Sequence, residues 1–246
     1  MENIYAIILA AGKGTRMNSE ALPKVLFPLG RQTMLEHALA PIHAFGIEKP
    51  VIIIGFLGHL VKEKLGPAYV YVNQEQQLGT AHAVLMARPV LEGKKGCTII
   101  VTGDHPFFKV ETLQRLTDAV LVKGATISVL TIQSAEPEFD AFGRVITDND
   151  GHVLRIVEKK DANPEELSAS LRNLSAYAVD NSWLWPVLER IEKSPVSGEY
   201  YLTDIVGEAV REGKKVFAVP ITDPAEALGI NTPEHLAEAE QILARQ

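Results

Sequence analysis

Short, uninterrupted apolar runs alternate with longer amphipathic segments along the sequence, and this alternation limits the folds open to it. Residues 51–54 read Val-Ile-Ile-Ile, and Ile4–Ala11 and Cys97–Val101 are similar. Strands of this kind suit a sheet that is covered on both faces. Their alternation with helices predicts crossover units and a mostly parallel sheet. We expect strands near 4–10, 50–55, 69–72, 97–102, 125–131, 142–147, 152–157, 174–179 and 215–219, and helices near 33–45, 58–65, 79–91, 110–122, 182–192, 201–212 and 232–244.

The second half of the chain differs from the first. Asn149-Asp150-Gly151 lies between two strand-like segments and is typical of a hairpin turn. Near the end, Thr232 followed by Pro233 predicts the start of a helix. No linker rich in Pro, Gly or Ser divides the sequence, so we expect residues 1–246 to form a single domain. The predicted fold is a Rossmann-like, three-layer α/β domain with a smaller antiparallel portion.

Charge and cysteine content narrow the classes of function. Acidic residues outnumber basic ones by 31 to 24, which disfavours binding to nucleic acid or to an anionic membrane. The only cysteine, Cys97, opens an apolar run and is expected in the core. Ile4–Ala11 approaches a signal-peptide core in length, but Glu2 precedes it instead of a basic residue. No stretch approaches the roughly 20 apolar residues of a membrane span, and we expect a cytoplasmic protein.

A glycine-containing loop follows the first predicted strand. Leu9–Met17 holds two glycines with Lys13 and Arg16, and small residues let backbone N–H groups approach an anion. The spacing fits neither the P-loop nor the dinucleotide-binding glycine pattern. The alternative is a tight turn with two solvated cations.

Lys24 lies in a segment of restricted backbone. Pro23 and Pro28 flank Lys24-Val25-Leu26-Phe27 and favour an extended conformation. A lone lysine is more often a solvated surface charge, so this segment by itself does not assign a function to Lys24.

These two segments and several later motifs resemble the sugar-nucleotide pyrophosphorylases, and are most similar to the uridylyltransferase domain of bacterial N-acetylglucosamine-1-phosphate uridylyltransferases. The resemblance runs from about residue 4 to residue 240. Besides the two segments, it rests on residues 74–83 (QEQQLGTAHA), 103–106 (GDHP), 142–145 (FGRV), 156–162 (IVEKKDA), 198–204 (GEYYLTD) and 229–231 (GIN). It implies a nucleotide-diphospho-sugar transferase fold, with a nucleotide-binding half at about 1–110 and a sugar-phosphate-binding half at about 111–246.

The resemblance implies a nucleotide site in the first half. Gln74 can offer an amide donor and acceptor to a uracil edge, although an exposed amide at a strand end is the alternative. His82 is expected to be a packed histidine. The implied nucleotide-binding residues are Leu9, Ala10, Ala11, Gly12, Gly14, Thr15, Gln74, Gln77, Gly79 and Thr80, and the implied catalytic cations are Lys13, Arg16 and Lys24.

Asp104 and Asn231 are the implied magnesium ligands. Asp104 follows the apolar strand at 97–102, and ligands of open α/β sheets bind at the carboxyl ends of strands. Hard oxygen donors are what Mg²⁺ prefers. Asp104 could instead open a turn before Pro106, and Asn231 could serve only at a helix N-terminus.

The resemblance places the sugar phosphate on Gly143, Glu158 and Asn173, with Tyr201 and Thr203 as wall residues. Glu158 could instead form a salt bridge beside Lys159 in the hairpin.

Four features depart from the family pattern. Asn173-Leu174-Ser175 stands for Asn-Thr-Gly, Thr102 for a frequent aromatic residue, and His105 for a small apolar one. One extra residue lies between Arg16 and Lys24. These changes put the identity of the sugar in doubt. We also expect this chain to lack the hexapeptide-repeat acetyltransferase domain of the two-domain relatives.

The sequence therefore predicts an Mg²⁺-dependent nucleotidyltransferase that joins UTP to a sugar 1-phosphate, with N-acetylglucosamine 1-phosphate or a related hexose 1-phosphate as acceptor. Alternatives are another triphosphate, a phosphate or phosphonate acceptor that is not a sugar, a nucleotide-sugar sensor without turnover, and a nicotinamide oxidoreductase, which would need the missing glycine pattern. We expect a monomer or homodimer.

Overall fold

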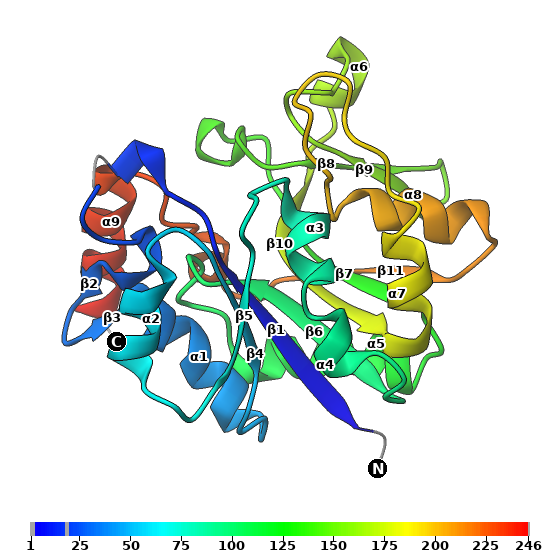
Figure 1. Ribbon diagram of the computed structural model, residues 1–246. Helices are drawn as coiled ribbons and strands as arrows, with labels where there is room; N and C mark the ends of the chain where they lie inside the picture. Colours follow the sequence, from blue (N-terminus) through cyan, green and yellow to red (C-terminus); the bar gives the residue numbers. More distant parts are fainter. Residues whose placement is uncertain (1–2, 18–19, 246) are drawn as a thin grey trace.

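The computed structural model describes residues 3–17 and 20–245. Within them, nine strands form one sheet, whose main path has the order β11-β7-β10-β6-β1-β4-β5 (Figure 1). The seven strands of this path are β1 (Ile4–Ala10), β4 (Val51–Ile54), β5 (Val70–Asn73), β6 (Cys97–Thr102), β7 (Ile127–Gln133), β10 (Leu171–Asp180) and β11 (Val216–Pro220). Only β10 runs antiparallel to its neighbours on this path, β6 and β7. The predicted α/β class with a mostly parallel sheet is therefore confirmed.

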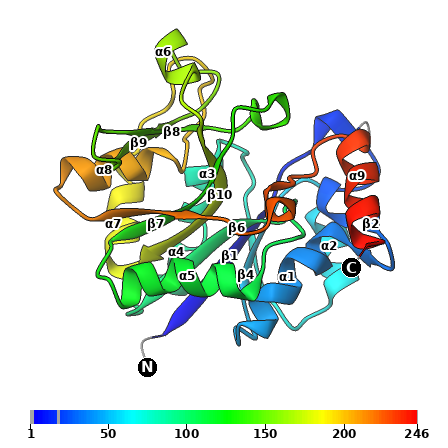
Figure 2. The same ribbon diagram turned by 180° about the vertical axis from the view of Figure 1, so that it is seen from behind.

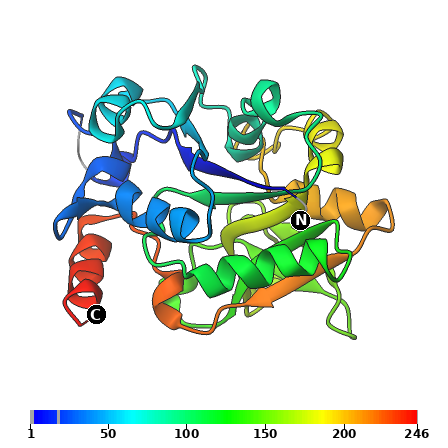
Figure 3. The same cartoon turned by 90° about the horizontal axis from the view of Figure 1, so that it is seen from below.

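Helices cover both faces of the sheet. Successive side chains of each central strand point to opposite faces, and both sets are apolar and must be buried. Ile8 of β1 packs in a core with α1 (Met34–Ala44), α2 (Gly58–Leu65) and α5 (Val110–Leu121). Ile7 packs in the opposite core with α3 (Thr80–Leu85), α4 (Arg88–Leu91), α7 (Asn181–Leu188) and α8 (Asp204–Arg211). Figures 2 and 3 show α5 lying along the sheet on the face opposite α7. Cys97 is fully buried, as expected.

A hairpin branches from β10 and extends the sheet at one end. It consists of β8 (Arg144–Thr147) and β9 (Val153–Val157), which pair antiparallel, with α6 (Pro164–Leu167) beyond them (Figure 1). The predicted turn at Asn149-Asp150-Gly151 is confirmed. β8 joins the main sheet where Arg144 pairs with Arg172 of β10.

The C-terminal helix packs away from the main sheet. α9 (Pro233–Leu243) begins as predicted, because the Thr232 side chain accepts a hydrogen bond from His235 N and Pro233 opens the first turn. It contacts the small ribbon of β2 (Pro28–Leu29) and β3 (Gln32–Thr33) around a third core that includes Leu29 and Ile230. The sequence did not predict this ribbon, whose strands are two residues long. Four 3₁₀ helices complete the described elements: η1 (Thr15–Met17), η2 (Lys24–Leu26), η3 (Pro137–Phe139) and η4 (Pro224–Ala227).

Two predicted elements differ from those in the structure. The helix expected over 79–91 is divided, since α3 ends at Leu85 and α4 restarts at Arg88 with Pro89 in its first turn. The strand expected at 174–179 begins at Leu171 and contains an irregularity between Asn173 and Tyr177. Polar side chains buried in its first half hid this extension in the sequence. None of the helices in the described residues is long and apolar enough to cross a membrane.

Candidate active site

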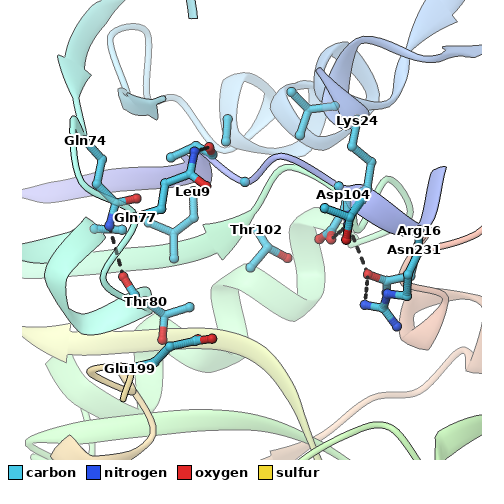
Figure 4. A pocket seen from close by; sticks show the side chains of 18 residues that line it. Leu9, Arg16, Lys24, Gln74, Gln77, Thr80, Thr102, Asp104, Glu199 and Asn231 are labelled. Carbon is cyan, nitrogen blue, oxygen red and sulfur yellow. Dashed lines mark hydrogen bonds and ion pairs between the residues drawn. The ribbon is translucent and has the colours of Figure 1, made fainter. Parts of the chain in front are cut away.

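A cavity of about 410 Å³ opens at the carboxyl ends of β1, β5 and β6. The chain proceeds from β1 to β4 and β5 on one side, then returns to β6 on the other, so β1 lies where the strand order reverses. Open α/β sheets bind ligands at such a point. Figure 4 shows the lining residues: Leu9, Ala10, Ala11, Gly12, Gly14, Thr15, Arg16, Lys24, Val25, Gln74, Gln77, Gly79, Thr80, Ala83, Thr102, Asp104, Glu199 and Asn231.

The loop after β1 forms one wall of this cavity. Gly14 has φ +63°, and a Cβ there would lie 2.5 Å from Lys24 Cβ, so the loop and the Lys24 segment can approach only with glycine at this position. The carbonyl of Ala11 accepts hydrogen bonds from Phe56 N at 3.2 Å and from Gln77 Nε2 at 2.7 Å. These contacts fix the start of the loop at Ala11.

Four side chains from distant parts of the sequence converge at one end of the cavity (Figure 4). Lys24 Nζ forms an ion pair with Asp104 and donates to Asn231 Oδ1 at 3.0 Å. Arg16 donates to the same oxygen at 2.9 Å. A carboxylate, an amide oxygen and two cations therefore meet within hydrogen-bonding distance.

Asp104 is held as a carboxylate in this cluster. Burial alone would raise the pKa of its carboxyl, but the charge of Lys24 and a hydrogen bond from His105 lower that pKa well below its ordinary value. Asp104 and Asn231 direct two hard oxygen atoms toward one cationic group, the Lys24 ammonium. This donor set fits a divalent cation such as Mg²⁺, which takes few protein oxygens and completes its shell with water and phosphate.

Amide side chains lie at the other end of the cavity. Gln74 is buried, and its Nε2 donates to Gly79 O at 3.1 Å and to His82 Nδ1 at 2.9 Å, which leaves its Oε1 as an acceptor. His82 therefore accepts a hydrogen bond from Gln74, and burial lowers the pKa of its imidazole. Gly79 has φ +119° and lies against the backbone of Tyr200, where a side chain would not fit.

The segment 199–203 connects this cavity to a second group of predicted residues. Leu202 N donates to Thr80 Oγ1 at 2.8 Å, and Tyr200 N donates to Leu78 O at 2.8 Å. Glu199 at the start of the segment lines the cavity, while Thr203 at its end donates to Glu158 Oε1 at 3.1 Å.

The residues predicted for the sugar phosphate lie close to one another. Glu158 Oε2 would be 3.6 Å from a Cβ at Gly143, and Gly143 O accepts from Asn173 N at 3.0 Å. Tyr201 and Glu158 also line a second cavity of about 710 Å³. Burial raises the pKa of Glu158, against the effect of its hydrogen bond from Thr203. The side chain of Asn173 is buried, and it bonds to Tyr177 OH and to Ser175 N.

Not every predicted site residue lines the first cavity. Lys13 is exposed and is not among the residues that line this cavity. Its Nζ lies 5.5 Å from the centre of the Phe56 ring. Conversely, Val25, Ala83, Thr102 and Glu199 line the cavity without having been predicted as site residues. Glu199 could have been identified from its place in the motif at 198–204. The two apolar residues carry no chemical pattern that a sequence would reveal.

Comparison with known proteins shows the family of this chain. A model of the nucleotidyl transferase family matches residues 5–225. The bifunctional protein GlmU of Geobacillus thermodenitrificans is 41% identical over 239 residues, which are 97% of this chain and 51% of that protein. GlmU of Enterococcus faecalis is 42% identical over 246 residues, 100% of this chain and 53% of that protein. The chain thus spans about half the length of the curated relatives it matches.

A solved structure shares the fold. UDP-glucose pyrophosphorylase complexed with UDP-glucose superposes with a TM-score of 0.80 at 17% identity, covering 100% of this chain and 99% of that one. The predicted resemblance is confirmed. Because the family model matches most of this chain, the chain belongs to the nucleotidyl transferase family.

Proposed function

We propose that the protein transfers a uridylyl group from UTP to a sugar 1-phosphate, with N-acetylglucosamine 1-phosphate or a related hexose 1-phosphate as acceptor. The observation that carries the proposal is the distribution of polar groups along one cavity. Cations with Asp104 and Asn231 lie at one end, and the buried Gln74 lies at the other. A nucleoside triphosphate has the complementary order of groups, a polyanion at one end and a hydrogen-bonding base at the other.

The proposed reaction needs no general base. The nucleophile is an oxygen of the acceptor phosphate monoester, which is largely ionised at neutral pH because its second pKa is about 6. This oxygen forms a bond to the α-phosphorus of UTP. The bond from that phosphorus to the bridging oxygen breaks, and pyrophosphate leaves with the electron pair. Positioning and charge neutralisation then account for catalysis.

The cations have separate roles in this proposal. Lys24 lies between the glycine loop and the Asp104 carboxylate, and it would stabilise the α-phosphate and the incoming phosphate. Arg16 and the backbone N–H groups of residues 11–15 would hold the leaving pyrophosphate. Lys13 would be a second cation for that group, since it lies exposed on the same loop.

Asp104 and Asn231 would hold Mg²⁺. When bound, the ion neutralises phosphate charge and favours displacement at the α-phosphorus. The support is the chemistry of the donors: both oxygens already contact one cationic nitrogen, that of Lys24.

Glu158, Thr203 and Gly143 would orient the sugar, because a carboxylate and a hydroxyl can bond to sugar hydroxyls. The altered 173–175 segment is the reason to test several acceptors. Ser175 adopts φ +56° where the family pattern has glycine, so this segment keeps a backbone that suits glycine but carries a side chain.

The deciding experiment measures pyrophosphate release in the presence of Mg²⁺, with UTP and the other triphosphates, across a panel of sugar 1-phosphates. We expect release with UTP and one hexosamine or hexose 1-phosphate, and its loss in Asp104→Ala. Release only with another triphosphate, or only with an acceptor that is not a sugar, would refute the substrate assignment. Tight UTP binding without release from any pair would favour a sensor, and near-normal turnover by Asp104→Ala with saturating Mg²⁺ would refute the role of Asp104.

A further inference from the structure

Thr102 and His105 are both unusual for the family pattern, and the structure brings them into contact beside Asp104. His105 Nδ1 lies 2.7 Å from Thr102 Oγ1 and 3.0 Å from Asp104 Oδ1. His105 is buried, with only 4% of its surface exposed. Two substitutions that looked unrelated in the sequence thus meet at the carboxylate on which the proposed chemistry depends.

The arrangement determines which ring nitrogen carries the proton. An ionised carboxylate can only accept hydrogen bonds, so the contact with Asp104 Oδ1 requires a proton on Nδ1. The other nitrogen, Nε2, is buried and finds no hydrogen-bond partner among the described residues, so no acceptor draws the proton there. The Nδ1–H is shared between the Asp104 carboxylate and the Thr102 hydroxyl oxygen, which lie on the same side of the ring.

The imidazole ring is held in place on its other sides by packing. It stacks on Phe108, with ring centres 5.3 Å apart and planes within 6° of parallel. A Cβ at Gly229 would lie 2.7 Å from Nε2, so the ring edge fits only because residue 229 is glycine. Ile230 N donates to Asp104 O at 2.9 Å, and Asn231 follows directly. The ring of His105, on the same segment as Asp104, therefore lies against the segment 229–231 that carries Asn231.

We propose that His105, aligned by Thr102, is a positioning residue that orients the Asp104 carboxylate and sets its place relative to Asn231 for binding a divalent cation. One oxygen of Asp104 is engaged by the imidazole, which leaves the other, Oδ2, directed at the cavity and at Lys24. Partners of this kind fix the orientation of a ligating carboxylate, and their loss costs about 10- to 100-fold in metal affinity. The inference rests on the proposed metal-binding role of Asp104 and not on the identity of the sugar.

The test measures Mn²⁺ binding directly, from the electron paramagnetic resonance signal of free Mn²⁺, without nucleotide and without turnover. Asp104→Ala defines the part of the binding that depends on this carboxylate. His105→Phe keeps an aromatic ring to stack on Phe108 but removes the donor, and should weaken that part by about 10- to 100-fold. His105→Asn places an amide N–H near the position of Nδ1 and should restore most of the affinity.

Thr102→Val removes only the hydroxyl and should weaken binding in the same direction, whereas Thr102→Ser should not. His37→Phe is the matched control, since His37 on α1 bonds to Leu29 O at 2.9 Å and takes no part in the cavity. It should leave Mn²⁺ binding unchanged. A purely structural role for His105 would lower thermal stability without changing the Mn²⁺ affinity of the folded protein.

Wild-type Mn²⁺ affinity in a folded His105→Phe protein would overturn the proposal, as would the absence of any binding lost in Asp104→Ala. Should His105→Phe fail to fold, Thr102→Val decides, and unchanged affinity in that variant refutes the alignment. If the wild type binds Mn²⁺ through Asp104 but releases no pyrophosphate from any substrate pair, the proposed function fails while this inference stands.

Discussion

The carboxyl group of Asp204 makes the free energy of unfolding decrease as pH rises toward neutrality. Burial raises the pKa of Asp204 to about 6 from an ordinary 3.8, and the negative charges of Asp161 and Glu208 add to the rise while Arg211 opposes it. Between these two pKa values the folded chain binds more protons than the unfolded chain. The free energy of unfolding therefore falls as pH rises from about 4 through about 6, and the loss is complete above that range.

Replacing Asp204 with Asn should recover that loss at neutral pH. The full shift corresponds to about 3 kcal/mol at 1.36 kcal/mol per pKa unit, which is an upper bound. Asp204 is only half-buried, so screening by water reduces the gain to roughly 1.5 kcal/mol. Asp204 is also the first residue of α8, where a negative charge is favourable by about 0.5 kcal/mol. We expect Asp204→Asn to be more stable by about 1 kcal/mol at pH 7.5.

Urea unfolding followed by tryptophan fluorescence at pH 7.5, 6 and 5 measures this effect. The gain of Asp204→Asn should shrink by about half at pH 5. At that pH the wild-type carboxyl is mostly protonated in the folded state but still mostly ionised in the unfolded state. Glu240→Gln, an exposed carboxylate on α9, should change stability little at any of these pH values. A less stable Asp204→Asn at pH 7.5, or a gain that does not decrease at pH 5, would show that the folded state does not disfavour the Asp204 carboxylate.

Three other substitutions test the site and its surroundings. Gly79→Ala places a Cβ 2.7 Å from Tyr200 N at φ +119°, so we expect a loss of at least about 2 kcal/mol in urea unfolding and weaker UTP binding by calorimetry. Lys24→Met should lower kcat by at least about 100-fold in the pyrophosphate-release assay and also destabilise the fold, since it leaves the Asp104 carboxylate without its cation; turnover near the wild-type rate would contradict the role of Lys24. Ser175→Gly should raise the free energy of unfolding by about 0.5 kcal/mol, because relief of φ +56° slightly exceeds the added entropy of the unfolded chain, and a lower midpoint in urea would contradict this.

Apolar patterning predicted the elements that are covered on both faces. The runs at 4–10, 51–54 and 97–102 form neighbouring parallel strands. The end of the third run correctly predicted that Asp104 lies at the carboxyl end of a strand, where it lines the cavity. Patterning failed where polar side chains are buried. Arg172 is 4% exposed and Asn173 is 2% exposed, and both lie in the part of β10 that precedes the strand expected at 174–179. Arg172 pairs with Arg144 of β8, which lies far away in the sequence, so a sequence window cannot show that Arg172 lies inside a strand.

The candidate site was predicted less evenly. The resemblance identified Lys24, Asp104 and Asn231, whose spacing in the sequence gives no reason for them to meet. It could not predict the contact between Thr102 and His105, because both residues depart from the pattern that carried the resemblance. The division into halves near residue 110, the sugar, the bound cation and the oligomeric state stay predictions.

The position of Asn231 shows how the last part of the chain completes the site. Ile230 beside it is fully buried with Leu29 and bonds to Asp104 through its backbone. Upstream, the buried Glu226 accepts a hydrogen bond from Lys109 N at the start of α5. These contacts tie the segment to the strand end at Asp104, although the family match stops at residue 225. The geometry of the proposed metal ligands thus depends on apolar burial beyond the matched region, and not on the Lys24 contact alone.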